Sequence, residues 1–75
     1  MLKDIGKIIR YHRKKAKLSQ IELAHLANLG KATVFDIEKG KMTVQLDNVI
    51  KILSVLNIEI KFHSPLMEQY ERDIK

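Results

Sequence analysis

The sequence contains no cysteine, so it has neither a disulfide framework nor a thiolate ligand for a metal site. Long apolar runs are also missing, and none approaches the roughly 20 residues that a helix needs to cross a bilayer. The N-terminus, residues 1–5, lacks the apolar core of a signal peptide. These absences make a cytoplasmic protein with no membrane partner the expectation.

Catalytic signatures are scarce as well. The glycines do not form a phosphate-binding loop, because Gly40-Lys41 is followed by Met42 and no glycine stands five residues earlier. Three histidines lack the spacing of metal ligands and have no cysteine companions: His12, His25 and His63. We therefore expect no enzyme, no cofactor and no metal site.

What the 75 residues do contain is an uneven distribution of charge, with a net charge of +5. Residues 1–41 hold ten Lys and Arg against four Asp and Glu, whereas residues 42–75 hold four against five. A basic front half indicates a polyanionic partner, and ordinary solubility charge is the alternative. The length leaves room for one small domain.

Two short helices with a tight corner between them form the central pattern, over residues 19–27 and 31–39. Ser19 and Glu22 are three residues apart and predict a capping box at the start of the first helix. The positions expected to be buried have helical spacing: Leu23, Ala24, Ala27, Val34 and Ile37.

A glycine stands at each end of the second short helix. Gly30 is expected to free the backbone at the corner, and Gly40 is well placed to end the helix. The residues left facing outward near its start are Lys31, Ala32, Phe35 and Asp36. A short helix that presents its N-terminal residues, braced by another helix, is the helix-turn-helix reader of the DNA major groove.

Longer helices are predicted on either side of this pair. Residues 2–17 form an amphipathic helix in which Ile5, Ile9 and His12 share a face, and we interpret His12 as a partly buried structural histidine. In the fourth helix Ile52 lies off the apolar stripe and is left for a second interface. That stripe consists of Leu46, Val49, Ile50, Leu53 and Leu56.

Residues 57–63 alternate apolar and polar side chains, which is the period of a half-buried strand. A lone strand exposes unpaired backbone groups, and the same strand from a second copy across a two-fold axis satisfies them. We therefore expect a homodimer that pairs through Ile58, Ile60 and Phe62, with an irregular extension as the alternative. The tail, residues 64–75, is expected to be either disordered or partner-binding.

The expected DNA contacts gather on and around the second short helix. Gln20, with the N-terminal amides of its own helix, is expected to hold a phosphate. Lys31 donates to guanine or phosphate, and Ala32 packs on a thymine methyl. Phe35 either meets a thymine or sugar or folds back onto the core, and Asp36 accepts from cytosine or repels wrong sequences. A solvated surface role is the alternative for the lysines. Further phosphate contacts are expected at the edges of the site: Thr33, Lys39, Lys41 and Thr43.

The run of residues 18–40 resembles the Cro/CI-type (XRE) helix-turn-helix family, whose pattern is Leu-Ser-Gln, Glu-Leu-Ala, Thr-(Val/Ile) and Ile-Glu-x-Gly. Those segments stand at residues 18–20, 22–24, 33–34 and 37–40. With its flanking helices the resemblance covers roughly residues 5–56. It implies a mainly α, lambda-repressor-like domain of four or five helices, to which the residues above add a C-terminal strand paired across a homodimer. It also implies a structural salt bridge between Arg13 and Glu38.

A narrower resemblance is to HipB-type antitoxins, and it rests on residues 31–34, residues 51–53 and the strand directly after the fourth helix. That group consists of dimers that pair a C-terminal strand, repress their own operon and bind a HipA-type kinase toxin. The resemblance implies an autoregulating antitoxin with a palindromic operator and a HipA-like serine/threonine kinase partner. Residues 1–63 then form the DNA-binding and dimerisation domain. The alternatives are a phage or housekeeping regulator without a toxin, and a protein-interaction adaptor that no longer reads DNA.

Overall fold

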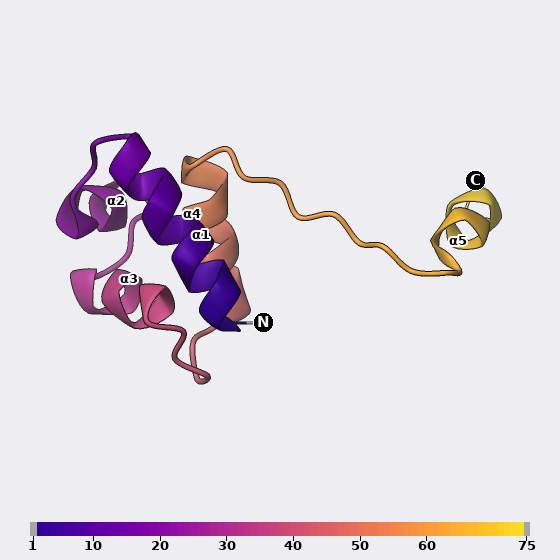
Figure 1. Cartoon of the computed structure of the whole chain (residues 1–75), viewed down its shortest axis with the longest axis horizontal. Coiled ribbons are helices and arrows are strands. Elements are labelled where there is room, and N and C mark those ends of the chain that lie inside the picture. Colours follow the sequence, from indigo (N-terminus) through magenta and orange to yellow (C-terminus); the bar gives the residue numbers. More distant parts are fainter. Residues whose placement is uncertain (1, 75) are drawn as a thin grey trace.

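The computed structural model describes residues 2–74, and most of them lie in helices (Figure 1). In chain order the helices are α1 (Leu2–Lys15), α2 (Gln20–Leu26), α3 (Lys31–Glu38), α4 (Leu46–Val55) and α5 (Met67–Asp73). Helices α1 to α4 form one body, and α5 lies apart at the end of an extended segment. The expected mainly helical class is confirmed. Met1 and Lys75 lie outside the described residues.

Each of the first four helices is followed by a residue with a left-handed backbone. These residues are Lys17 (φ 60°), Asn28 (φ 57°), Gly40 (φ 78°) and Asn57 (φ 57°). In each case the amide of the following residue donates to the carbonyl five residues earlier, at distances between 2.8 and 3.1 Å. This closure satisfies carbonyls that a helix end otherwise leaves unpaired. The role expected of Gly40 is confirmed.

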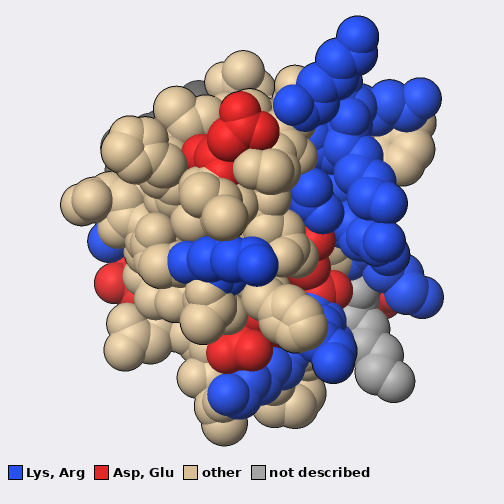
Figure 2. All heavy atoms as spheres, turned by 90° about the vertical axis from the view of Figure 1, so that its left-hand side faces the viewer, with Lys and Arg blue, Asp and Glu red and all other residues tan. Residues whose placement is uncertain are grey.

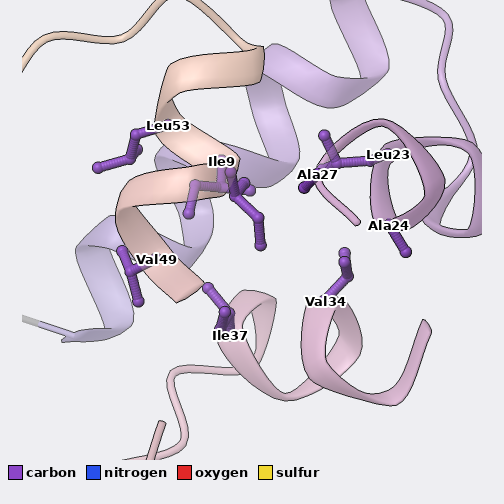
Figure 3. Packing of buried hydrophobic residues seen from close by; sticks show 9 residues of the cluster. Ile9, Leu23, Ala24, Ala27, Val34, Ile37, Val49 and Leu53 are labelled. Carbon is purple, nitrogen blue, oxygen red and sulfur yellow. The ribbon is translucent and has the colours of Figure 1, made fainter. Parts of the chain in front are cut away.

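Apolar side chains from all four helices of the body meet in one core (Figure 3). Its nine buried members are Ile9, Leu23, Ala24, Ala27, Val34, Ile37, Val49, Ile52 and Leu53. The five buried positions expected in the two short helices are therefore confirmed. Because α2 and α3 are short, their stability comes from this packing rather than from helix propensity.

The buried face of α4 differs in part from the one expected: Val49 and Leu53 are buried and Leu56 packs against the core as expected, but other positions differ. Ile52, which was placed off the apolar stripe, is fully buried, whereas Leu46 and Ile50 are 68% and 47% exposed. The core-facing row runs through Val49, Ile52 and Leu53, the spacing of three and four residues that a 3.6-residue turn requires. A stripe containing Leu46 and Ile50 was also consistent with that period, but these two side chains lie on the outer face of α4.

His12 is another correction, because its side chain is exposed rather than partly buried. Its Nδ1 lies 2.7 Å from the carbonyl oxygen of Ile8. Arg13, four residues after the buried Ile9, occupies the core side of α1 instead and is 8% exposed. A charged residue at that position requires a partner in the interior, and α3 provides one.

Residues 58–64 form an extended arm that leaves the end of α4 (Figure 1). No strand is present between residues 2 and 74, so the strand expected at residues 57–63 is not formed in the single chain. Asn57 cannot belong to one, because its left-handed backbone closes α4. Ile58 packs against the core, and the rest of the arm has no second strand in the described chain to pair with. Pairing with a second copy stays a prediction.

The tail after this arm contains α5, none of whose residues is buried. Leu66, Tyr70 and Ile74, which fall on one side of it, are all more than half exposed. Binding of a partner by the tail stays a prediction. Among the described residues, no helix has the length and apolar character needed to cross a membrane.

Candidate nucleic-acid interface

The start of α2 is fixed by the capping box that the sequence predicts. The Glu22 amide donates to Ser19 Oγ at 3.0 Å, and the Ser19 amide donates to Glu22 Oε1 at 2.8 Å. The bond from the Ser19 backbone, and then the Ser19 hydroxyl, lower the pKa of Glu22 below its ordinary value. This cap makes Gln20 the first residue of the helix.

The corner between α2 and α3 is built differently from the expectation. Gly30 has φ −78°, a conformation open to any residue, so its freedom is not used there. Asn28 takes the left-handed conformation instead, and the Leu29 amide closes the turn on the Ala24 carbonyl at 2.8 Å. Asparagine tolerates this conformation better than most residues. Gly30 serves as the N-cap of α3 and offers no side-chain hydrogen bond to it.

Arg13 and Glu38 form the ion pair that the family resemblance implies. Arg13 Nε donates to Glu38 Oε2 at 2.6 Å and Nη2 donates to Oε1 at 3.0 Å, while Nη1 donates to the Leu18 carbonyl at 2.9 Å. The two side chains are only 10% and 4% exposed. Gln20 Nε2 also donates to Glu38 Oε1, at 3.2 Å. One carboxylate thus joins α1, the start of α2 and the end of α3.

The outer side of α3 carries most of the residues expected to contact DNA. Lys31 and Ala32 are exposed at its start. Phe35 is 39% exposed, and the Lys39 ammonium lies 5.0 Å from its ring centroid, so the ring has not folded into the core. Asp36 is half-buried and lies 3.5 Å from the Lys41 ammonium.

Two hollows bring the remaining expected residues together. One, of about 170 Å³, is lined by Thr33, Asp36, Lys41 and Thr43, together with residues near the start of α4. The other, of about 290 Å³, lies between α1, α2 and α3 and includes Gln20, Phe35 and Lys39.

Two α4-side residues and one arginine were missed by reasoning from the sequence. The first hollow is completed by Gln45 and Asn48, and the second by Arg10. The spacing of the two arginines could have identified Arg10 as a site residue, because residues three apart lie on one side of a helix and Arg10 stands three residues before Arg13. Nothing in the local pattern marks Gln45 or Asn48.

Basic side chains gather on this part of the molecule (Figure 2). On the side where α2 and α3 lie, Lys and Arg form a continuous column along one edge, and further basic side chains stand on the face itself. Acidic side chains on this face are few and separated. Such a distribution attracts a polyanion. Within residues 2–74 no cluster of His, Cys, Asp or Glu is suited to a metal ion.

A short helix pair whose second helix buries one side and exposes its N-terminal residues defines the helix-turn-helix class. The helix-turn-helix family model HTH_3 matches residues 9–62, and the chain belongs to this XRE-type family of DNA-binding regulators. It is 39% identical over 62 residues to an uncharacterised HTH-type transcriptional regulator, y4mF, of Sinorhizobium fredii, covering 83% of this chain and 82% of that protein. It is also 32% identical over 56 residues to the immunity repressor protein of Bacillus phage phi105. That match covers 75% of this chain but only 39% of the repressor.

Proposed function

We propose that the protein is a sequence-specific transcriptional repressor that places α3 in the major groove of duplex DNA. The observation that carries the proposal is the two-sidedness of α3. Val34 and Ile37 are buried at 0% and 2% exposure, while Lys31 and Ala32 are exposed at the N-terminal end. A recognition helix uses this arrangement, in which its first residues meet base edges and its inner side is held by the domain.

Each outward residue has a role that its chemistry supports. Lys31 donates to guanine O6 and N7 or to a phosphate, and Ala32 meets a thymine methyl group. Phe35, which is 39% exposed, contacts a thymine methyl or a deoxyribose. Asp36 accepts from cytosine N4, and Lys41 at 3.5 Å offsets the repulsion between this carboxylate and the phosphates.

The proposal includes a homodimer that forms through the arm. Ile60 and Phe62 are 50% and 77% exposed and, with Ile50 and Leu53, line a groove of about 550 Å³ between α4 and the arm. Antiparallel pairing of two arms would satisfy their backbone groups and bring apolar side chains of the second copy over this groove. Two α3 helices would then meet half-sites about one helical turn apart on a palindrome.

Sedimentation of the Phe62→Asp variant tests this dimer. A charge in the apolar layer should leave a monomer at micromolar concentration, whereas Lys61→Gln, on the exposed side of the same arm, should remain dimeric. A Phe62→Asp protein that sediments as a dimer would rule out the shared arm.

An antitoxin role is the narrower part of the proposal. Its support is the resemblance to HipB-type antitoxins at residues 31–34, residues 51–53 and the arm. On this view the repressor also binds a HipA-like kinase. The likeness to a phage immunity repressor supports instead a regulator without a toxin. Co-expression with any kinase-like reading frame beside the gene separates the two, because only an antitoxin co-purifies with that product.

Selection from a pool of randomised duplexes tests the main proposal. The full chain should enrich a two-fold symmetric sequence with half-sites about one turn apart. Enrichment of a single half-site would leave α3 as the reader but remove the dimer. Retention of duplexes with no common sequence would mean that α3 does not read bases, and the protein would then be an adaptor rather than a repressor.

A further inference from the structure

The hollow between α1, α2 and α3 combines positive charge with a fixed amide. Its volume is about 290 Å³. The residues around it are Arg10, Arg13, Gln20, Phe35, Glu38 and Lys39. They come from three helices, so the hollow depends on the assembled fold rather than on any one helix.

Two of the three cations in this hollow are uncompensated. Both oxygens of Glu38 accept from Arg13, so this buried pair contributes no net charge. No ion pair involving Arg10 or Lys39 is found among residues 2–74. The Lys39 ammonium is held 5.0 Å from the Phe35 ring centroid, which restricts it to this side of α3. The hollow is therefore suited to an anion.

The Arg13–Glu38 pair also orients the amide of Gln20. The carboxylate oxygens of Glu38 accept from Arg13, and the nitrogen of the Gln20 amide faces them, donating to Oε1 at 3.2 Å. That nitrogen carries a second hydrogen, which is left for another acceptor. Glu38 thus acts as a positioning residue for Gln20.

We propose that this hollow binds one backbone phosphate of the DNA duplex, with Arg10 of α1 as an anchor outside the helix-turn-helix unit. Arg10 and Lys39 supply the charge, and the second amide hydrogen of Gln20 donates to a phosphate oxygen. This inference rests on the proposed DNA-binding function and adds α1 to the interface. A contact there fixes the angle at which α3 enters the groove, because α1 and α3 are tied together by Arg13 and Glu38.

Salt-dependent binding of the Arg10→Gln variant tests the phosphate site. Lys51→Gln is the matched control, since it removes one exposed positive charge on α4, away from the hollow. Anisotropy titrations use the selected duplex and a random duplex at several salt concentrations. Arg10→Gln should reduce the slope of log K against log salt by about 1 and weaken binding to both duplexes by a similar factor, because a phosphate contact carries no sequence information. Lys51→Gln should keep the wild-type slope.

A double-mutant cycle tests the place of Gln20 in the same site. Arg10→Gln and Gln20→Ala should together weaken DNA binding by less than the product of their separate factors, because they share one phosphate. Thermal unfolding of each variant checks that the fold is retained. Independent effects with an unchanged salt slope would overturn the phosphate site while leaving the repressor intact. A wild-type chain that binds neither duplex would instead overturn the proposed function and this site with it.

Discussion

Gly6 of α1 lies directly against the end of α3, where a Cβ on Gly6 would stand 2.6 Å from the carbonyl oxygen of Glu38. A second backbone oxygen, that of Ile37, would be equally close. Contacts this short with backbone atoms cannot be relieved by a side-chain movement. The absence of a side chain at Gly6 is therefore what allows α1 to approach α3 closely.

Gly6→Ala should accordingly lower the free energy of unfolding by about 1–3 kcal/mol, the usual effect of overpacking an interior contact. Gly30→Ser is the matched glycine control, because a Cβ there meets nothing within 4 Å. Its hydroxyl can cap α3, so a gain of a few tenths of a kcal/mol is expected. Urea unfolding measures the free energy of unfolding of both glycine variants. Equal stabilities for Gly6→Ala and wild type would contradict this account of the α1–α3 contact.

Glu38→Ala should lower the free energy of unfolding by about 3–5 kcal/mol, because it leaves the guanidinium of Arg13 buried without a partner. The exposed pair of Glu68 and Arg72, at 3.9 Å, provides the control. Glu68→Ala should change stability by less than about 0.5 kcal/mol. A similar small effect from both variants in urea unfolding would mean that the Arg13–Glu38 pair does not hold α1 to α3.

The helix-turn-helix unit was largely predictable because its signals are local. A capping box, helical spacing of apolar residues and Gly40 act within a few residues of one another, and all three are present as expected. The position of the left-handed residue between α2 and α3 was not predictable, because either Asn28 or Gly30 can close that corner. In the structure Gly30 is the extended N-cap of α3, and Asn28 takes the left-handed conformation.

The missed features depend on contacts between distant residues. The stripe expected on α4 was correct for Val49, Leu53 and Leu56 but wrong at its edge, because packing against the other helices buries Ile52 and leaves Ile50 exposed. Arg13 rather than His12 faces inward because Glu38, 25 residues away, provides its partner. Arg10 enters the candidate interface for the same reason, since the hollow exists only when three helices meet.

Acid should weaken the fold partly through Glu22. The capping bonds lower the pKa of Glu22 in the folded chain, so its ionised form stabilises the fold above its unfolded-state pKa. That stabilisation is lost as the pH falls through the lowered folded-state value. Wild type should thus be more stable than Glu22→Gln near neutrality, and the difference should shrink below about pH 4. A difference that is constant from neutral to acid pH in thermal unfolding would show that ionisation of Glu22 does not matter.

Lys31→Ala should weaken binding to the selected duplex by about 1–3 kcal/mol and relax the preference at one base pair, provided that Lys31 reads a base. Lys51→Ala removes an exposed lysine on α4 and should change neither the affinity nor the preference at any base pair. Anisotropy titrations on the duplex and on single-base variants of it measure both effects. A loss that is equal on every sequence would assign Lys31 to a phosphate, and unchanged affinity would remove it from the interface.

The most direct test of the central proposal is an anisotropy titration of the full chain onto the DNA upstream of its own gene and onto a random duplex, each at low and at physiological salt. If α3 reads bases, binding to the upstream DNA should be tighter by about a thousandfold or more at physiological salt, and both affinities should fall steeply as salt rises. Equal and weak binding to the two duplexes would contradict a sequence-specific, self-regulating repressor.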